Sequence, residues 1–288
     1  MKPVIAVGVD GSPESRAAAR WAAREAERRR LGVRLVHAWL WQPSAFPVVP
    51  DREEETRRAE AVLREAADEL AARHPELDVS ADVVPDLAPH ALLRASEQAG
   101  LLVLGSRGHG VLAGFLLGSY GQQVIAEARC PVVSVRAADG PDADGKEVVV
   151  GQQGGLEDSH DVLALAFETA AARGVGVRAV RAWALPPLYA YSPGSLYLAD
   201  QLGGLEPFEV AALRQALEPW RAKYPDVPVV EHVEMGSGGQ VLLTAAATAG
   251  LVVVGRRARR AAVGPRIGSV AHAVLHHAPC PVAVVPHA

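Results

Sequence analysis

The stretch VIAVGVDGSP, residues 4–13, decides how this chain begins to fold. Val4 to Val9 form a short apolar run rich in β-branched residues, which predicts a buried strand. Ser12 and Pro13 then predict the start of a helix, because serine suits the capping position and proline the first turn. We expect this helix to end at Gly32. A buried strand that leads directly into a helix is typical of an α/β protein.

The same alternation of strands and helices continues along the first half of the chain. Further strands are predicted at residues 33–40, 79–84, 101–104 and 131–135, and further helices at 52–73, 89–99 and 118–128. The strands are apolar on both faces, so we expect a parallel sheet that is covered by helices on both sides. Because ligands of such sheets bind beyond the carboxyl ends of the strands, the residues that follow each strand are candidates for a site.

The second half of the chain repeats the first. Residues 33–39 match residues 177–183 at five of seven positions, and residues 99–107 match residues 249–257 at six of nine. The matches keep one order along the chain, which indicates a tandem duplication of a unit of normal domain size. The predicted division is a first domain at residues 1–138, a polar linker at 139–145 and a second domain at 146–288.

Composition excludes several classes of protein. Hydrophobic residues make up 49% of the 288 residues and charged residues 22%, so the chain has enough apolar surface to fold. A net charge of −4 favours neither nucleic acid nor an anionic membrane as a partner. We see no secretion signal and no apolar run long enough to span a membrane, and we expect a cytoplasmic protein. Two cysteines cannot form a disulfide framework.

The first candidate site follows the first strand. Asp10 can accept hydrogen bonds from a ribose or hold a metal-bound water, Gly11 allows a tight turn, and Ser12 caps the helix. Taken alone, this stretch is better interpreted as an ordinary helix start.

The second candidate site follows the fourth strand and consists of GSRG at residues 105–108, nine further residues, and Gly118-Ser119. Glycines let backbone N–H groups come close to phosphate oxygens, and the helix that opens at Gly118 offers unpaired N–H donors. Ser119 can add a hydroxyl donor, and Arg107 can add a positive charge. A flexible glycine-rich connection is the alternative, which the position at the strand ends disfavours.

Other nucleotide and catalytic motifs are missing from the sequence. It contains no G-x-x-x-x-G-K-[ST] and no G-x-G-x-x-G after the first strand, so neither a Walker-type NTPase nor a dinucleotide site is supported. No catalytic triad and no H-E-x-x-H stands out. These motifs therefore give no reason to expect an enzyme.

These motifs resemble those of the universal stress protein family. The resemblance rests on the turn at Asp10, the glycine signature at 105–119 and the final strand that begins Cys130-Pro131-Val132, and it covers nearly the whole chain as two tandem family domains. It implies that each domain is an open, mainly parallel sheet of five strands with helices on both faces. This fold is Rossmann-like, of the adenine nucleotide hydrolase-like type. It also implies that ATP or another adenine nucleotide binds at the strand ends, and that the last strand mediates dimerisation.

The resemblance also implies where domain 1 contacts the nucleotide. The acidic residue of the family matches Asp10, and backbone contacts match Gly8 and Ala38. Tyr120 departs from the small residue common in the family, although a backbone contact survives that change. The full set is Gly8, Asp10, Ser12, Ala38, Gly105, Ser106, Arg107, Gly108, Gly118, Ser119 and Tyr120. No catalytic residue is assigned, and the one candidate metal contact is Asp10 through Mg²⁺ bound to ATP.

Domain 2 keeps the motif only in part. Gln153-Gly154-Gly155 stands opposite Asp10-Gly11-Ser12, and Ala258 stands opposite Gly108, so we expect weaker or absent ATP binding there. The basic loop at 256–260 can compensate by charge, bind another anion or simply be a solvated surface. The positions that match nucleotide contacts are Gly151, Ala182, Gly255, Arg256, Arg257, Gly268, Ser269 and Val270.

Three functions fit these observations. The first is a stress-response or regulatory module in which ATP, AMP or another adenine nucleotide shifts conformation or assembly. The second is a slow Mg-dependent ATPase, with Asp10 as the one obvious general base. The third is a protein-interaction scaffold that has lost nucleotide binding, above all in domain 2. We also expect the apolar final strands, 131–135 and 281–285, to pair as an internal pseudo-dimer, which leaves a homodimer of whole chains open.

Overall fold

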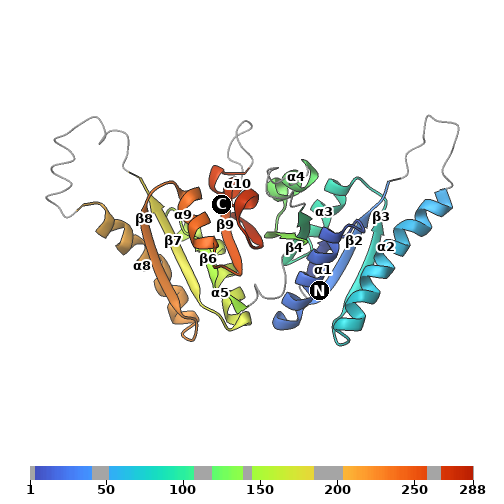
Figure 1. The fold of residues 1–288 in the computed structure, drawn as a ribbon, viewed down its shortest axis with the longest axis horizontal. Coiled ribbons are helices and arrows are strands. Elements are labelled where there is room, and N and C mark those ends of the chain that lie inside the picture. The colour runs from blue at the N-terminus through green and yellow to red at the C-terminus, as the bar shows by residue number, and fades with distance from the viewer. Residues whose placement is uncertain are drawn as a thin grey trace. The chain divides into compact units, whose positions relative to one another are not determined.

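A computed structural model describes residues 4–40, 52–106, 119–138, 145–184, 204–257 and 267–287. The chain forms two compact units, of which unit 1 holds the described residues up to 138 and unit 2 holds nearly all of those from 145 onward. Both units are α/β structures in which strands and helices alternate along the chain (Figure 1). Among the described residues, no helix is long and apolar enough to cross a membrane.

Unit 1 is a parallel sheet with helices on both faces. Its elements are β1 (Val4–Gly8), α1 (Pro13–Arg29), β2 (Gly32–Ala38), α2 (Arg52–Arg73), β3 (Val79–Val84), α3 (Ala88–Ser96), β4 (Leu101–Ser106), α4 (Ser119–Glu127) and β5 (Val132–Arg136). The strand order is β3-β2-β1-β4-β5, and every neighbouring pair is parallel. Helices α1 and α2 contact each other, as do α3 and α4, so each face of the sheet carries one pair.

Unit 2 repeats this architecture. Its elements are β6 (Val148–Gly151), α5 (Leu156–Arg173), β7 (Val177–Trp183), α8 (Glu206–Lys223), β8 (Val229–Met235), α9 (Gly238–Ala246), β9 (Leu251–Arg257), α10 (Ser269–His277) and β10 (Val282–His287). The order is β8-β7-β6-β9-β10, again with parallel neighbours. The predicted fold class, two tandem five-stranded α/β units, is confirmed.

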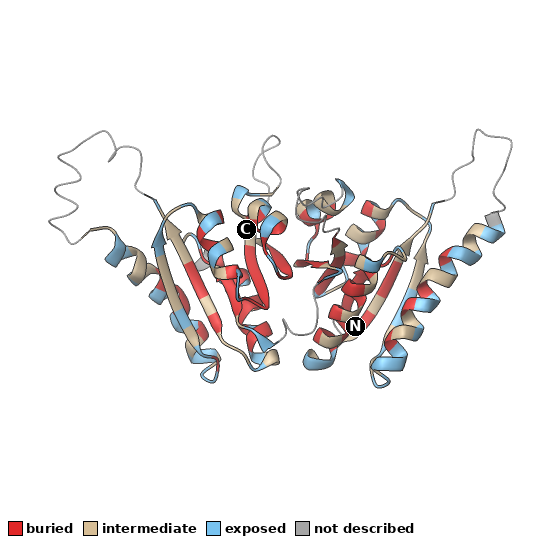
Figure 2. Ribbon diagram, in the orientation of Figure 1, coloured by how far each residue is buried: buried red, intermediate tan, exposed pale blue. Residues whose placement is uncertain are grey.

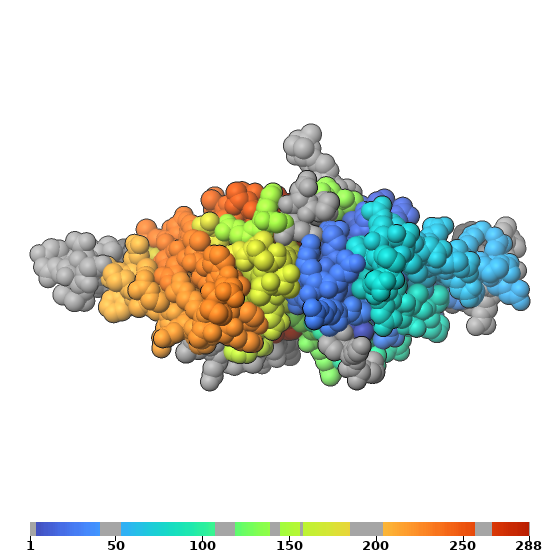
Figure 3. Space-filling view, turned by 90° about the horizontal axis from the view of Figure 1, so that it is seen from below, coloured from blue at the N-terminus to red at the C-terminus, as the bar shows by residue number. Residues whose placement is uncertain are grey.

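The core lies on both faces of each sheet, as the apolar strands predict (Figure 2). Ile5, Ala6 and Val7 of the central strand β1 have no exposed surface, and Val148 to Val150 of β6 have none either. A strand is buried on both faces only when helices cover both sides of its sheet. On the surface of unit 1, residues of α1 (blue) lie beside those of α2 and β3 (cyan) (Figure 3).

The prediction that Gly32 ends the first helix was wrong. Helix α1 ends at Arg29, and Arg30 takes the left-handed conformation with φ 55°, donating its N–H to the carbonyl oxygens of Ala26 and Glu27. The same place in unit 2 is held by Gly174 at φ 67°, which a glycine adopts without strain. Gly32 instead begins β2.

Candidate functional site

The candidate site of unit 1 lies where the direction of chain winding reverses. Strands β1 and β4 are neighbours at the centre of the sheet; β2 lies on the far side of β1, and β5 on the far side of β4. In open α/β sheets, ligands bind beyond the carboxyl ends of the two strands at such a point. Asp10, Gly105 and Ser106 all lie at this edge, as the sequence predicted from the order of the strands.

The turn after β1 presents a carboxylate at this edge. Gly11 has φ 80°, a conformation that favours glycine, and it lets the chain turn directly into α1. The Ser12 N–H and hydroxyl both donate to Asp10 Oδ1, at 2.9 Å and 2.5 Å. The same hydroxyl accepts the Ser15 N–H at 3.1 Å, which makes Ser12 the N-cap of α1. Asp10 is exposed, so its carboxylate is oriented by the turn and still accessible to a ligand.

Strand β2 ends next to this turn. The Val9 N–H donates to the carbonyl oxygen of Val36 at 2.9 Å, and His37 Nδ1 lies 2.6 Å from the carbonyl oxygen of Val9. This bond gives His37 a structural role at the end of β1. Ala38, the last residue of β2, is half-buried beside it, at the position that the resemblance assigns to a backbone contact with the base.

Two of the predicted contact glycines have a packing role. A Cβ on Gly8 would lie 3.1 Å from side-chain atoms of Leu104 and Leu92. A Cβ on Gly105 would lie 2.5 Å from the carbonyl carbon of Glu14, so a glycine is needed for the first turn of α1 to rest on β4. The sequence analysis attributed Gly105 to phosphate approach, and that contact stays a prediction.

The phosphate side of the predicted site is described only at its far end. Ser106 is buried, and its hydroxyl lies 3.4 Å from the carbonyl oxygen of Val135 within the sheet. Ser119 and Tyr120 are exposed and form the first turn of α4, and the N-terminus of a helix favours an anion. Arg107, Gly108 and Gly118 lie outside the described residues.

In unit 2 the turn after the first strand has the same shape and different chemistry. Gly154 has φ 79°, as Gly11 has 80°, but the N-cap of α5 is Gly155, which has no side chain. The Gly155 N–H donates instead to Asp158 Oδ2 at 3.2 Å. The carboxylate at this edge therefore comes from the first turn of the helix itself, a substitution that the sequence analysis missed.

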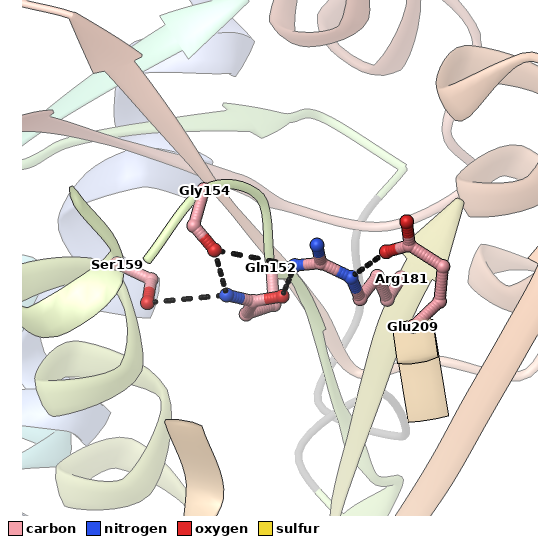
Figure 4. Close-up of polar contacts among 5 residues, drawn as sticks. All are labelled: Gln152, Gly154, Ser159, Arg181 and Glu209. Carbon is pink, nitrogen blue, oxygen red and sulfur yellow. Dashed lines mark hydrogen bonds and ion pairs between the residues drawn. The ribbon is translucent and has the colours of Figure 1, made fainter. Parts of the chain in front are cut away.

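A second feature of unit 2 that the sequence analysis missed is a polar network at the ends of β6 and β7 (Figure 4). Gln152, only 3% exposed, donates from Nε2 to the Gly154 carbonyl at 3.1 Å and to Ser159 Oγ at 3.4 Å. Its Oε1 accepts Arg181 Nη1 at 2.6 Å, and Arg181 Nε donates to Glu209 Oε2 at 2.5 Å. The sequence did contain a signal for this network: it has polar Gln152 and Glu209 where the first half has apolar Val9 and Ala59.

The other predicted contacts of unit 2 are mostly at strand ends. Gly151 and Gly255 are closely packed, since a Cβ on either would come within 2.9 Å and 2.8 Å of Leu242 and His287, respectively. Ala182 is half-buried near the end of β7, and Arg257 is the last residue of β9. Gly268 caps α10, and Ser269 and Val270 form its first turn. Of the three alternatives for residues 256–260, a solvated surface does not fit Arg256, which is 7% exposed and lies within β9.

Neither metal chemistry nor thiol chemistry is apparent in the described ranges. They contain no group of three or more His, Cys, Asp or Glu side chains that could hold a metal ion. Cys130 and Cys280 are buried and form no disulfide, and burial raises the pKa of Cys130 to about 12. At neutral pH the Cys130 thiol is therefore protonated and a poor nucleophile.

The strand order and the turn after β1 define the class of protein, a Rossmann-like α/β protein with two units. Unit 1 presents an acidic turn at the point where the direction of its chain winding reverses. The universal stress protein family model matches residues 1–136 and 146–286. The chain belongs to the universal stress protein family.

Curated relatives agree over almost the full length. A universal stress protein of Mycobacterium tuberculosis is 35% identical over 289 residues, which cover 97% of this chain and 96% of the relative. One of Mycolicibacterium smegmatis is 34% identical over 293 residues, covering 98% and 96%. The crystal structure of a universal stress protein from Archaeoglobus fulgidus is similar in fold, with a TM-score of 0.73, 16% identity and coverage of 99% and 98%.

Two further solved universal stress proteins cover about half of this chain. One is described as a complex with cAMP; it is 27% identical over 48% of this chain and 98% of its own, with a TM-score of 0.37. The other, from Archaeoglobus fulgidus, is described as a complex with dAMP; it is 22% identical over 46% of this chain and 97% of its own, with a TM-score of 0.38. Both of those proteins are thus described in complexes with adenine nucleotides.

Proposed function

We propose that unit 1 binds an adenine nucleotide, ATP in the first place, at the carboxyl ends of β1 and β4. The observation that carries this proposal is the Asp10 turn, which presents an exposed, oriented carboxylate at the switch point of a parallel sheet. A carboxylate in this position accepts hydrogen bonds from ribose hydroxyl groups, and Ala38 at the end of β2 offers backbone to the base.

The phosphates of the proposed ligand point toward the N-terminus of α4. The exposed N–H groups at Ser119 and Tyr120 lie at the positive end of the helix dipole, which favours a phosphate. We include Arg107, Gly108 and Gly118 among the proposed phosphate contacts because of their positions in the sequence motif. A Mg²⁺ ion brought with ATP would be reached by Asp10, the carboxylate of this turn.

The proposed role of the nucleotide is regulatory. A ligand bound beyond the ends of β1 and β4 stabilises one conformation, and it thereby shifts an assembly or signalling equilibrium. Hydrolysis needs a positioned base, and Asp10 accepts two hydrogen bonds from Ser12 in its turn. We therefore expect turnover to be slow, so that the bound nucleotide acts as a signal.

The deciding experiment is mass spectrometry of the nucleotide released from freshly purified, denatured protein, with its amount per chain. It is paired with thermal unfolding of wild type, Asp10→Ala and the matched control Gln153→Ala, with and without ATP–Mg²⁺. At 100 times its Kd a ligand adds about 2.7 kcal/mol to stability. We expect wild type and Gln153→Ala to gain this and Asp10→Ala to gain much less. Absence of both released nucleotide and a thermal shift would support the interaction-scaffold alternative.

The final strands support a second, smaller proposal about assembly. Strand β5 is the last strand in the order of unit 1, and β10 is the last strand in the order of unit 2. Apolar edge strands favour pairing, so we propose that β5 and β10 pair within the chain. Hydrogen exchange tests this: slow exchange of the β5 and β10 amides at all protein concentrations supports the internal pair. Exchange that slows only as concentration rises would indicate pairing between chains.

A further inference from the structure

The polar network of unit 2 occupies the place that corresponds to the ligand edge of unit 1. Gly8 pairs with Val36 and Gly151 pairs with Val180, so His37 and Arg181 hold the same position one residue further along β2 and β7. The Gln152 N–H donates to the Val180 carbonyl at 2.9 Å, as the Val9 N–H does to Val36.

The third member of the network also has a clear counterpart. The turns that follow α2 and α8 close with equivalent bonds, from Leu77 to His74 and from Val227 to Tyr224, both at 3.1 Å. This correspondence places Glu209 opposite Ala59, which is 3% exposed and has no polar group in its side chain. Unit 2 therefore differs from unit 1 by three matched changes: glutamine for Val9, arginine for His37 and glutamate for Ala59.

The three changed side chains satisfy one another's hydrogen-bonding groups and charges. The Arg181 side chain, 16% exposed, donates to Gln152, to the Gly154 carbonyl and to Glu209, so its charge is paired although it is largely removed from water. Gln152 is buried and needs Arg181 to satisfy its carbonyl oxygen. A ligand that displaced Arg181 would leave a buried acceptor and the Glu209 charge without this partner, which is costly.

One more feature of unit 2 opposes a nucleotide at this edge. The His287 ring lies 2.8 Å from where a Cβ of Gly255 would be, at the carboxyl end of β9. Unit 1 has Ala137, whose side chain is a single methyl group, at the corresponding place.

We infer that unit 2 carries a self-occupied site, in which Arg181, held by Gln152 and Glu209, fills the edge where unit 1 receives its nucleotide. These three side chains are then specificity-determining residues that reject adenine nucleotides and hold the ends of β6 and β7 together without a ligand. This inference rests on the proposed function for the identity of the excluded ligand. The chain accordingly binds one nucleotide, in unit 1.

Hydrogen exchange followed by mass spectrometry on the full chain tests this inference. ATP–Mg²⁺ is expected to slow exchange in peptides covering residues 8–12 and to leave residues 151–155 unchanged. Without nucleotide, Arg181→Ala and the near-isosteric Glu209→Gln are each expected to speed exchange at residues 151–155, by about tenfold for Arg181→Ala, equivalent to about 1.4 kcal/mol. The control Arg214→Gln, in an exposed ion pair of the same unit, is expected to leave them unchanged.

The possible outcomes separate the two proposals. Protection of residues 151–155 by ATP–Mg²⁺ in wild type would overturn the self-occupied site, and so would unchanged exchange there in both network variants. If no adenine nucleotide protects residues 8–12 while both variants still loosen residues 151–155, the proposed function fails. The network is then supported as the holder of this edge.

Discussion

Substitution of Gly105 by alanine tests the packing that positions the whole edge of unit 1. The new Cβ would lie 2.5 Å from the carbonyl carbon of Glu14, 2.6 Å from the Ser15 nitrogen and 2.7 Å from the Glu14 oxygen. All three atoms belong to the backbone of the first turn of α1, which cannot move aside as a flexible side chain can. The matched variant is Gly255→Ala in unit 2, where the closest atoms, at 2.8 Å, belong to the ring of His287 near the end of the chain.

The size of the effect follows from these distances. Ordinary contact begins at 3.4 Å, so the first turn of α1 must retreat by 3.4 − 2.5 Å, about 0.9 Å, from β4. Forcing an extra carbon into a closely packed interior typically costs about 1–3 kcal/mol. We therefore expect Gly105→Ala to lose about 2 kcal/mol and Gly255→Ala less than about 1 kcal/mol, since a histidine side chain can change its rotamer. The retreat of α1 also displaces Ser12 and Asp10, so we expect the affinity for the proposed nucleotide to fall together with stability.

Urea unfolding measures the loss in free energy of unfolding for both variants. Hydrogen exchange resolved by peptide shows whether this loss falls on α1 and β4 or on α5 and β9. A Gly105→Ala protein within about 0.5 kcal/mol of wild type would refute this reasoning, because surface changes of no structural consequence have effects of that size. A Gly255→Ala protein that loses as much as Gly105→Ala would refute it equally.

Three further predictions concern local features. Ser12→Ala removes the N-cap of α1 and should cost about 1 kcal/mol in urea unfolding, whereas Ser12→Gly should cost only a few tenths; equal losses would count against capping as the cause. Because Cys130 and Cys280 are buried, a thiol reagent should modify neither in the native protein and both after denaturation; rapid labelling of either native thiol would contradict this. Burial raises the pKa of Glu231, but hydrogen bonds from its two arginine partners outweigh this and hold that pKa below its usual value. The ionised form is therefore favoured in the folded protein, so the stability from Glu231 is present above about pH 4 and is lost as pH falls through the lowered pKa. Glu231→Gln should cost about 0.5–1 kcal/mol at pH 7, since the partners are substantially exposed, and nothing at pH 2; a cost independent of pH would exclude the charge as its source.

Much of the fold could be predicted from sequence because its signals are local. The helix expected at 52–73 and the strand expected at 79–84 have those bounds in the structure as α2 and β3. Helical spacing and β-branched runs act over a few residues, and they survive whatever packs against them. The error at Gly32 has the same origin: glycine is the usual residue at a helix end, but Arg30 occupies the left-handed position two residues earlier.

The candidate site was predictable to the extent that it is built from neighbours in sequence. The Asp10 turn consists of bonds within five residues, so its shape is present in the sequence itself. The role of Gly105 was not predictable in this way, because what excludes a side chain there is the backbone of Glu14, on another element. The nucleotide contacts assigned to Arg107, Gly108 and Gly118 stay predictions.

The sequence by itself determined that the chain is a duplicated α/β protein, that its first unit carries an acidic turn and that its second has lost it. Repeats, periodicity and turn residues are properties of the linear chain, so they can be read without coordinates. Only the tertiary structure brought Gln152, Arg181 and Glu209 together, across separations of 29 and 28 residues, and buried Arg256 within a strand. The physical reason is that a buried polar side chain must find its partner in space, and the fold decides which distant residue that partner is.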